Sequence, residues 1–575
     1  MQSHPLHPDA NYNLGLLAIS AKKPESALSL FKIALTSDPN IEKFWLSYID
    51  ALIRVHQLDI ATHFLEQAKI RSFSLTKLSI LETRIKQKIE VNNPSQQLID
   101  KLLEHYQAGR LEDAESMALS ITLKYPNHPF SWKVLGAVLK QSGRITESLV
   151  PMKKSVQLAP QDAEAHYNLA VSLQEIERLT DAEVSYLRVL NLKPDHALAH
   201  SNLGIILYEL GRFKEAEASY MRAIELQPDF ADAHGNFGIA LNAEGLLERA
   251  CEHFHKNFQL ERGPKLLNPG HRSFLSISKA KIDHDIEQFE YLANEGNSVK
   301  NFTELAVAYK KVSSEIVWAS DTDIVRLNRN HRRVLSDTYN RPIHIIKAPV
   351  RDESAINKTL NVSRITNDYF SHEFGLTYID DFLSPNTLAS LRSFLLGSTI
   401  WFDFFHSGGY LGAYLKEGLA SPLILQIAED LRKKLPKIFK DYKLTQLWAY
   451  KYDSRASKNN NSFDGIGVHA DFAAINVNFW ITPNSANLDP ASGGLVVYNT
   501  EAPLNWGFDA YNHSKEKILE QIKKRGGGKE IVPYKENRSV IFNSNLFHKT
   551  DRINFKEGYE NRRINVTMLF GRRGL

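Results

Sequence analysis

Two patterns of hydrophobic and polar positions divide the 575-residue chain. Up to about residue 261, apolar and small residues recur at helical spacing, and the whole pattern repeats every 34 residues. The units end at Pro126, Pro160, Pro194 and Pro228, and small residues keep one register at Ala114, Ser148, Ala182, Ala216 and Ala250. A proline ends the second helix of each pair, and small side chains let paired helices approach closely. The pattern therefore predicts an α-helical solenoid over residues 1–261, irregular around residues 72–95.

From about residue 366, the helical period gives way to short stretches in which apolar and polar residues alternate. These stretches lie at residues 443–453, 474–482, 492–499, 529–534, 539–543 and 563–571. Strands separated by glycine turns favour a jelly roll (double-stranded β-helix) over residues 366–575. Residues 262–365 break the repeat but keep some helical spacing, so we expect a helical bridge there. The predicted fold class is a multidomain α + β protein, a helical solenoid followed by a jelly roll.

Three residues of the β-rich part have the spacing of a metal site. His469 and Asp471 stand two positions apart, and His548 follows 77 residues after the aspartate. Residues i and i+2 of a strand project from one face, so the first two can bind one ion from one strand while His548 comes from another. Two imidazoles and a carboxylate that leave other positions open are typical of non-haem iron(II) oxygenases. These three residues are the predicted metal ligands.

The order of segments resembles the Fe(II)/2-oxoglutarate-dependent dioxygenases, in particular their prolyl-hydroxylase-like branch. The resemblance covers Gly375 to Gly571: an aromatic strand with tyrosine, H-x-D, a strand, SGG-L, a strand, a distal histidine, then arginine and an alternating apolar strand. It implies a jelly-roll oxygenase domain that uses Fe(II), 2-oxoglutarate as co-substrate and O₂.

The resemblance also implies a basic residue that binds the distal carboxylate of 2-oxoglutarate, on the strand after the second histidine. Arg563 opens that strand, and its guanidinium fork matches a carboxylate, while its neighbour Arg562 points to the other face. The 15-residue gap from the distal histidine is longer than is usual in the family, which leaves Arg552 as a rival anchor. Tyr452 matches a tyrosine that hydroxylases of this branch use on the same carboxylate, and Tyr450 shares its face.

Candidate residues for the pocket wall lie on the strand after the aspartate. Asn476, Asn478 and Trp480 share one face of it, and Val477 and Phe479 share the other. The pattern leaves open which face is inside.

The segment 506–529 carries a helix-like stretch followed by Gly526, Gly527 and Gly528. We expect either a lid over the iron with a glycine hinge or a surface insertion with a basic, solvated end.

Composition excludes several classes of protein. A formal net charge of +4 with 24% charged residues gives no reason to expect a nucleic-acid or membrane partner. Cys251 is the only cysteine, so an internal disulfide and a cysteine-based metal site are excluded. The N-terminus lacks a secretory pattern, and no stretch of about 18 apolar residues occurs. We therefore expect a soluble cytoplasmic protein.

The solenoid sequence resembles tetratricopeptide repeats. Asn168, Asn202 and Asn236 recur with the repeat, and this run is similar to the repeats of O-GlcNAc transferase, whose asparagines bind the backbone of a protein substrate in the concave groove. A series of side-chain amides can hold an extended chain with little sequence preference. The alternative is a helix-packing residue copied as the repeats duplicated.

The expected function is that of an Fe(II)- and 2-oxoglutarate-dependent dioxygenase. Its substrate is expected to be a polypeptide recruited by the repeats, because the collagen prolyl 3-hydroxylases also join helical repeats to such a domain. Two alternatives stay open: a small-molecule or glycan hydroxylase whose repeats serve for assembly, and a repeat scaffold with an inactive oxygenase fold. The sequence leaves the oligomeric state undetermined.

Overall fold

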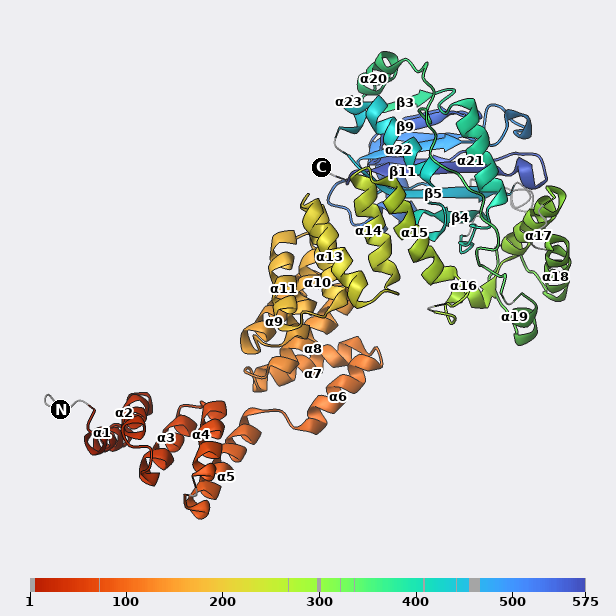
Figure 1. The fold of residues 1–575 in the computed structure, drawn as a ribbon. Helices are drawn as coiled ribbons and strands as arrows, with labels where there is room; N and C mark the ends of the chain where they lie inside the picture. The colour runs from red at the N-terminus through yellow and green to blue at the C-terminus, as the bar shows by residue number, and fades with distance from the viewer. Residues whose placement is uncertain are drawn as a thin grey trace. The chain divides into compact units, whose positions relative to one another are not determined.

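The structure is a computed structural model that describes residues 6–71, 73–266, 268–296, 301–320, 322–335, 337–406, 409–440, 442–453 and 466–573 (Figure 1). The chain forms two compact units, Met1–Pro194 and Asp195–Leu575. No described helix is both long and apolar enough to span a membrane.

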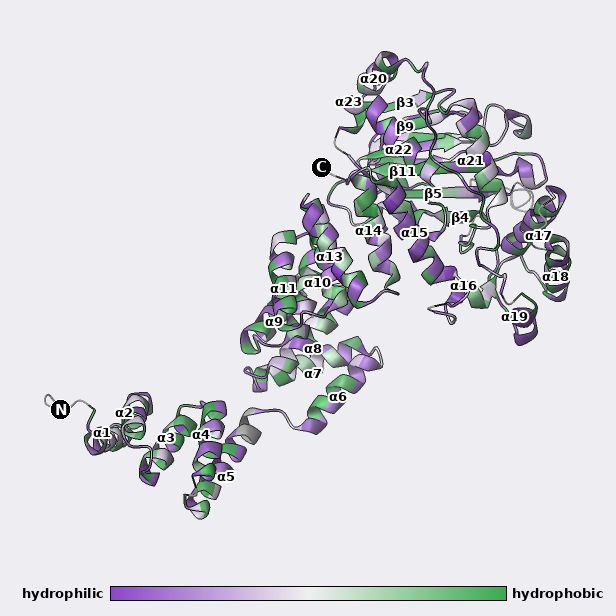
Figure 2. Ribbon diagram, viewed as in Figure 1, coloured by the Kyte–Doolittle hydropathy of each residue, from purple (hydrophilic) through white to green (hydrophobic). Residues whose placement is uncertain are grey.

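The first unit consists of helices that pack in consecutive pairs, as the 34-residue period predicts. Their bounds are α1 Pro8–Ser20, α2 Pro24–Ser37, α3 Glu42–Arg54, α4 Leu58–Ile70, α5 Leu75–Asn92, α6 Gln96–Gln107, α7 Leu111–Lys124, α8 Pro129–Gln141, α9 Ile145–Leu158, α10 Ala163–Glu175 and α11 Leu179–Leu192. The irregular stretch expected around residues 72–95 contains α5, an 18-residue helix. Hydrophobic and hydrophilic residues lie side by side along these helices (Figure 2), which is the amphipathic pattern of helices that bury one face.

The repeat continues into the second unit as α12 Ala197–Glu209, α13 Phe213–Leu226, α14 Ala231–Ala243 and α15 Leu247–Arg262. Helices α12 and α13 approach closely at Gly204, where a Cβ would lie 2.8 Å from ring atoms of Tyr220. The helical solenoid expected up to residue 261 is therefore confirmed.

The division into compact units lies within the repeats rather than at residue 261. Helices α14 and α15 pack against the C-terminal part through the one-turn helix η1 Leu415–Glu417. Nζ of Lys416 donates to Oδ1 of Asn236 at 2.6 Å, and Nδ2 of Asn257 donates to the carbonyl of Lys416 at 2.9 Å. Arg262 forms an ion pair of 2.5 Å with Glu417. These contacts explain why the last two helical pairs belong to the second unit.

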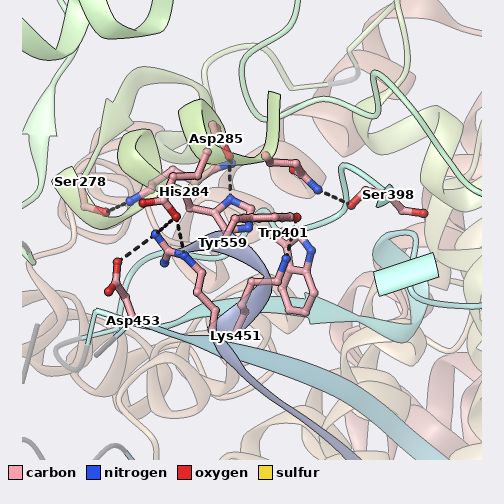
Figure 3. Close-up of polar contacts among 12 residues, drawn as sticks. Ser278, His284, Asp285, Ser398, Trp401, Lys451, Asp453 and Tyr559 are labelled. Atoms are coloured by element: carbon pink, nitrogen blue, oxygen red, sulfur yellow. Dashed lines mark hydrogen bonds and ion pairs between the residues drawn. The ribbon is translucent and has the colours of Figure 1, made fainter. Parts of the chain in front are cut away.

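Residues 262–365, where we expect a helical bridge, contain α16 Arg272–Leu275, β1 Ser276–Ile277, α17 Lys279–Asn294, α18 Phe302–Glu315, β2 Val325–Arg326, α19 Arg329–Leu335 and the start of α20 Val362–Ser371. Helix α17 contacts the β-rich part within a buried polar cluster (Figure 3). Nε2 of Gln288 donates to the carbonyls of Leu396 and Ser398 at 3.0 and 2.9 Å, and Glu287 forms an ion pair of 2.9 Å with Arg562. Lys451 donates to the hydroxyl of Tyr559 at 2.9 Å, and Lys281 and Asp285 form a buried ion pair at 2.7 Å.

The β-rich part contains β3 Leu376–Ile379, α21 Pro385–Gly397, β4 Leu411–Tyr414, α22 Pro422–Lys434, α23 Pro436–Phe439, β5 Leu444–Tyr452, β6 Ile475–Trp480, η2 Asn484–Ala486, β7 Leu495–Glu501, α25 Phe508–Asn512, α26 Lys515–Lys524, β8 Lys529–Val532, β9 Ser539–Asn543, β10 Leu546–Thr550, η3 Tyr559–Asn561 and β11 Arg563–Phe570. Six strands form an antiparallel sheet in the order β3-β9-β6-β11-β5-β4, and three form a second sheet in the order β10-β7-β8.

The two sheets share one apolar core. Trp480 and Phe542 of the six-stranded sheet belong to the same buried cluster as Val497 and Leu546 of the three-stranded sheet. Every residue of β6 and β11 is buried, because the outer face of the large sheet is also covered. On that outer face, the ring of Phe479 lies 5.3 Å from the ring of Phe382. The polar residues of β6 therefore belong to the inner face, which settles the choice that the sequence left open.

Candidate metal centre and its cavity

The three predicted ligands converge. His548 lies on β10, and His469 forms a bridge to it through two backbone hydrogen bonds of 3.0 and 2.8 Å. Nε2 of His548 is 3.4 Å from Oδ2 of Asp471, Nε2 of His469 is 3.8 Å from its Oδ1, and one ligand atom of each residue lies within 4.8 Å of the others. Among the described residues, no other group of three histidine, cysteine or acidic side chains is arranged in this way.

The backbone around Asp471 differs from the expectation of a single strand. His469 makes one isolated bridge, and Asp471 lies outside the strands, with its amide donating to the carbonyl of Ser544 at 3.2 Å. The chain leaves the sheet after His469 because the next amide, that of Ala470, donates to Tyr511 of the insertion.

Backbone carbonyls fix the orientation of both imidazoles. Nδ1 of His469 is 2.8 Å from the carbonyl of Gly467, and Nδ1 of His548 is 3.0 Å from that of Leu546. A carbonyl only accepts, so each Nδ1 carries a proton, and each Nε2 keeps its lone pair whenever its imidazole is neutral. This second contact is the one that metal-binding histidines use to fix ring orientation.

The electrostatics keep His469 and Asp471 in the protonation states that metal binding requires. Burial, followed by the charge of His548, lowers the pKa of His469 to about 4. Burial alone would raise the pKa of Asp471, but the hydrogen bond and charge of His548 and the charge of His469 outweigh it and lower that pKa. Neutral His469 and ionised Asp471 are therefore present together at neutral pH.

The ligands face a cavity of about 520 Å³. Its walls come from both sheets and from the insertion before β8. The large sheet contributes side chains of alternate residues on two strands, Trp448, Tyr450 and Tyr452 of β5 and Arg563, Asn565 and Thr567 of β11. Tyr410 and Tyr414 extend the aromatic side of the wall.

Arg563 is a buried cation at this wall, with 2% of its surface exposed. Its Nε donates to the carbonyl of Gly493 at 2.6 Å, its Nη2 to that of Gly494 at 3.3 Å, and its Nη1 to Oδ1 of Asn565 at 3.2 Å. Three of its five N–H groups are thus used, which leaves one on each terminal nitrogen. No carboxylate of the described residues forms a direct ion pair with it.

The tyrosines lie beside this cation. The guanidinium of Arg563 is 5.0 Å from the ring centroid of Tyr452, whose buried hydroxyl meets no hydrogen-bond partner of suitable geometry in the described part of the chain. The hydroxyl of Tyr450 is 3.5 Å from that of Tyr414. Arg552 is exposed in the loop after β10 and does not line the cavity. Arg562 points away from the cavity and binds Glu287 and Asp453, as the alternation predicts.

The polar residues of β6 take different places. Asn478 lines the cavity, Asn476 donates to Oδ2 of Asp471 at 2.6 Å, and Trp480 lies below the guanidinium of Arg563 at 5.7 Å.

The 506–529 insertion forms α25 and α26 and contributes Phe508, Asn512, His513 and Lys515 to the cavity wall. Ile518 and Ile522 of α26 are buried against Val468 and Ala470, so the insertion is packed beside the ligands rather than solvated throughout.

Sequence reasoning missed several wall residues. Asn565 and Thr567 follow Arg563 at i+2 and i+4, so strand alternation was a sufficient signal for both. Tyr410 and Tyr414 carry no such signal, because they reach the wall through pairing of the four-residue strand β4 with β5.

The recurring asparagines of the repeats lie on three different helices. Asn168 lies on α10 in the first unit, and Asn202 and Asn236 lie on α12 and α14 in the second. Oδ1 of Asn236 already accepts from Lys416, so the prediction that all three amides serve a bound peptide does not fit Asn236.

Comparison with known proteins identifies the repeats. Tetratricopeptide repeat families match residues 2–40, 163–196 and 197–230. The peroxisomal targeting signal receptor of Kluyveromyces lactis is 26% identical over 196 residues, which cover 31% of this chain and 34% of the receptor. The receptor of the same name from Eremothecium gossypii is 25% identical over 191 residues, which cover 31% and 33%. The chain thus spans about a third of the length of the curated relatives it matches.

Solved structures of MamA are also similar to part of the chain. One is 24% identical and covers 27% of this chain and 91% of its own, with a TM-score of 0.26. MamA from Desulfovibrio magneticus RS-1 is 21% identical and covers 28% and 93%, with a TM-score of 0.28. The family matches establish that the N-terminal part of the chain carries tetratricopeptide repeats.

Proposed function

We propose that the chain is an Fe(II)- and 2-oxoglutarate-dependent dioxygenase that hydroxylates a polypeptide recruited by its repeats. One observation carries the proposal: a buried His-Asp-His cluster and the unpaired cation of Arg563 face the same cavity. A divalent metal ion and a dicarboxylate are the two ligands whose charges fit these two ends.

The order of strand pairing supports a jelly roll. Along the chain, β5, β6, β9 and β11 belong to the large sheet, whereas the His469 bridge, β7, β8 and β10 belong to the small one. A chain that passes repeatedly between two facing sheets in this order is what a double-stranded β-helix requires.

Each residue has a defined task in this proposal. Nε2 of His469, Nε2 of His548 and a carboxylate oxygen of Asp471 would hold the ion. The two remaining N–H groups of Arg563 would form a bidentate pair with the distal carboxylate of 2-oxoglutarate, and the unpaired hydroxyl of Tyr452 would donate a third bond to it. The aromatic walls exclude water from the centre.

Fe(II) with 2-oxoglutarate supplies the activation of O₂ for hydroxylation when it is bound. The residues of the chain contribute position and charge, and none needs to act as a general acid or base.

The repeats support a polypeptide partner. The similar proteins from Kluyveromyces lactis and Eremothecium gossypii are named as receptors for a targeting signal, and tetratricopeptide arrays form curved surfaces that bind peptides. Since Asn236 is bonded to Lys416, we assign recruitment to the array as a whole rather than to its asparagines.

Succinate release tests the enzymatic proposal. The purified chain with Fe(II) and 2-oxoglutarate should form succinate, and His548→Ala should abolish this together with binding of one equivalent of Mn(II). A chain that binds Mn(II) but releases no succinate would favour a scaffold function. Equal turnover by His548→Ala would refute the metal assignment.

The substrate can be captured from a lysate with the inactive His548→Ala variant as bait. Captured polypeptides that gain the mass of one oxygen atom after incubation with the unaltered chain are the expected result. Small molecules that gain oxygen while no captured polypeptide does so would favour the small-molecule alternative.

A further inference from the structure

A continuous series of side-chain hydrogen bonds joins the two ends of the cavity. Nη1 of Arg563 donates to Oδ1 of Asn565 at 3.2 Å, and Nδ2 of Asn565 donates to Oδ1 of Asn478 at 3.3 Å. Nδ2 of Asn478 donates to Oδ1 of Asn476 at 2.6 Å, and Nδ2 of Asn476 donates to Oδ2 of Asp471 at 2.6 Å. Three amides thus connect the buried cation to the metal-binding carboxylate.

The chemistry of the two ends fixes the direction of every bond between them. An ionised carboxylate only accepts, so Asn476 must present its NH₂ to Asp471 and its oxygen to Asn478. A guanidinium only donates, so Asn565 must present its oxygen to Arg563 and its NH₂ to Asn478. The amide dipoles therefore all point the same way, and bonds in such a series polarise one another.

The three amides are buried in the sheet, so each of them lowers the stability of the fold unless its hydrogen bonds are formed. Asn476 is fully buried, and Asn478 and Asn565 are 6% and 5% exposed. The neighbouring Thr567 donates to Oδ1 of Asn478 at 2.8 Å and accepts from Nδ2 of Asn565 at 3.2 Å. Buried amides destabilise a core when they are left unpaired, and the outer face of β6 carries apolar Val477 instead.

We propose that the hydrogen-bonded series Asn476, Asn478 and Asn565 positions the metal-binding carboxylate and couples it to the anion site at Arg563. Asn476 holds Oδ2 of Asp471 and thereby leaves Oδ1 for the ion. These asparagines are positioning residues, because they act on the ligand through Asp471 and Arg563. The inference rests on the proposed function, and it adds the residues that hold Asp471 and Arg563 in place.

The place of each asparagine in the series predicts a different effect of replacing it by leucine, which has a similar shape. Asn476→Leu should weaken Mn(II) binding about 10- to 100-fold, the range typical of lost outer contacts to a metal ligand, with a smaller effect on the KM for 2-oxoglutarate. Asn565→Leu should raise that KM and affect Mn(II) binding less. Asn478→Leu, in the middle, should impair both.

A matched control is available on the neighbouring strand. Asn543 of β9 bonds Glu501 and lies outside the series, so Asn543→Leu should leave both constants unchanged. The visible spectrum of Co(II) bound to each variant reports coordination directly, and only Asn476→Leu and Asn478→Leu should alter it. If Asn476→Leu does not fold, Asn476→Ala, which removes the donor without adding a charge, should show the same loss of Mn(II) affinity.

Two outcomes would overturn the inference. One is a folded Asn476→Leu or Asn476→Ala variant that binds Mn(II) as tightly as the unaltered chain. The other is an equal loss in all three leucine variants that follows their thermal stability, which is the signature of a purely structural role. Failure of the unaltered chain to bind Mn(II) would overturn the metal site itself, so the two failures are distinguishable.

Discussion

Arg563→Ala should weaken the use of 2-oxoglutarate while leaving the metal site able to bind its ion. The structure leaves two N–H groups of this guanidinium for a ligand, since Gly493, Gly494 and Asn565 accept the other three. Two charge-assisted bonds at about 1.5–3 kcal/mol each, reduced because their contributions are not additive, give roughly 2–4 kcal/mol. A loss of this size corresponds to about a 30- to 1,000-fold rise in the apparent KM for 2-oxoglutarate.

The assay is succinate formation as a function of 2-oxoglutarate concentration, supported by calorimetry of 2-oxoglutarate binding to the Mn(II)-loaded chain. Arg563→Lys keeps the charge without the fork and should cause a smaller rise.

Arg562→Ala is the matched control for the loss of a buried arginine. It removes the adjacent guanidinium, which binds Glu287 and Asp453 away from the cavity, so it should lower stability without raising the KM. An equal rise in both alanine variants would show that the effect comes from general destabilisation. A rise in Arg552→Ala and none in Arg563→Ala would refute the assignment of the anchor.

Three further predictions concern stability, each measured by urea unfolding of the metal-free chain. Asp285→Ala should lower the free energy of unfolding by about 3–5 kcal/mol, because it leaves Lys281 buried and unpaired. The double variant Lys281→Met, Asp285→Leu should lower it much less, and an equal decrease in both variants would contradict a charge effect. Asn236→Ala should lower the free energy of unfolding by about 1–3 kcal/mol, because it removes the hydrogen bond to Lys416. A double-mutant cycle with Lys416→Met that shows no coupling energy would argue against this bond. As pH falls from 6.5 towards 4, unfolded chains protonate His469 while folded chains do not, so the free energy of unfolding should fall, and His469→Gln should remove that part of the decrease.

Much of the β-rich part could be predicted from sequence because strand alternation constrains which side chains share a face. The segments that contain Trp448 and Arg563 form paired strands with the expected faces, and His469 and His548 come together as their spacing predicts. The spacing predicts Asp471 on one strand with His469, whereas contacts with distant residues, such as that of its amide with the carbonyl of Ser544, hold it outside the strands.

Other features had no local signal. Lys451 alternates with aromatic residues on β5 and is fully buried. Its partners come from distant parts of the sequence, the carbonyl of Leu395 on α21 at 3.4 Å and the hydroxyl of Tyr559 on η3 at 2.9 Å. The bond between Asn236 and Lys416 joins residues 180 positions apart, and no periodic pattern links them. Contacts of this kind depend on how a domain packs on its neighbour, which the sequence of either part leaves unspecified.

The boundary between the compact units has a consequence for how such a protein can diversify. Because Asp195–Leu575 contains α12–α15 together with every residue of the cavity, whole repeats that precede Asp195 can be gained, lost or exchanged without changing the residues of the candidate metal centre. If the proposed function holds, the repeats that recruit a partner could therefore change in evolution while the residues of the cavity stay the same. Under the proposed function, a shortened chain that begins at Asp195 would keep every residue of the cavity and lose only the repeats that precede it.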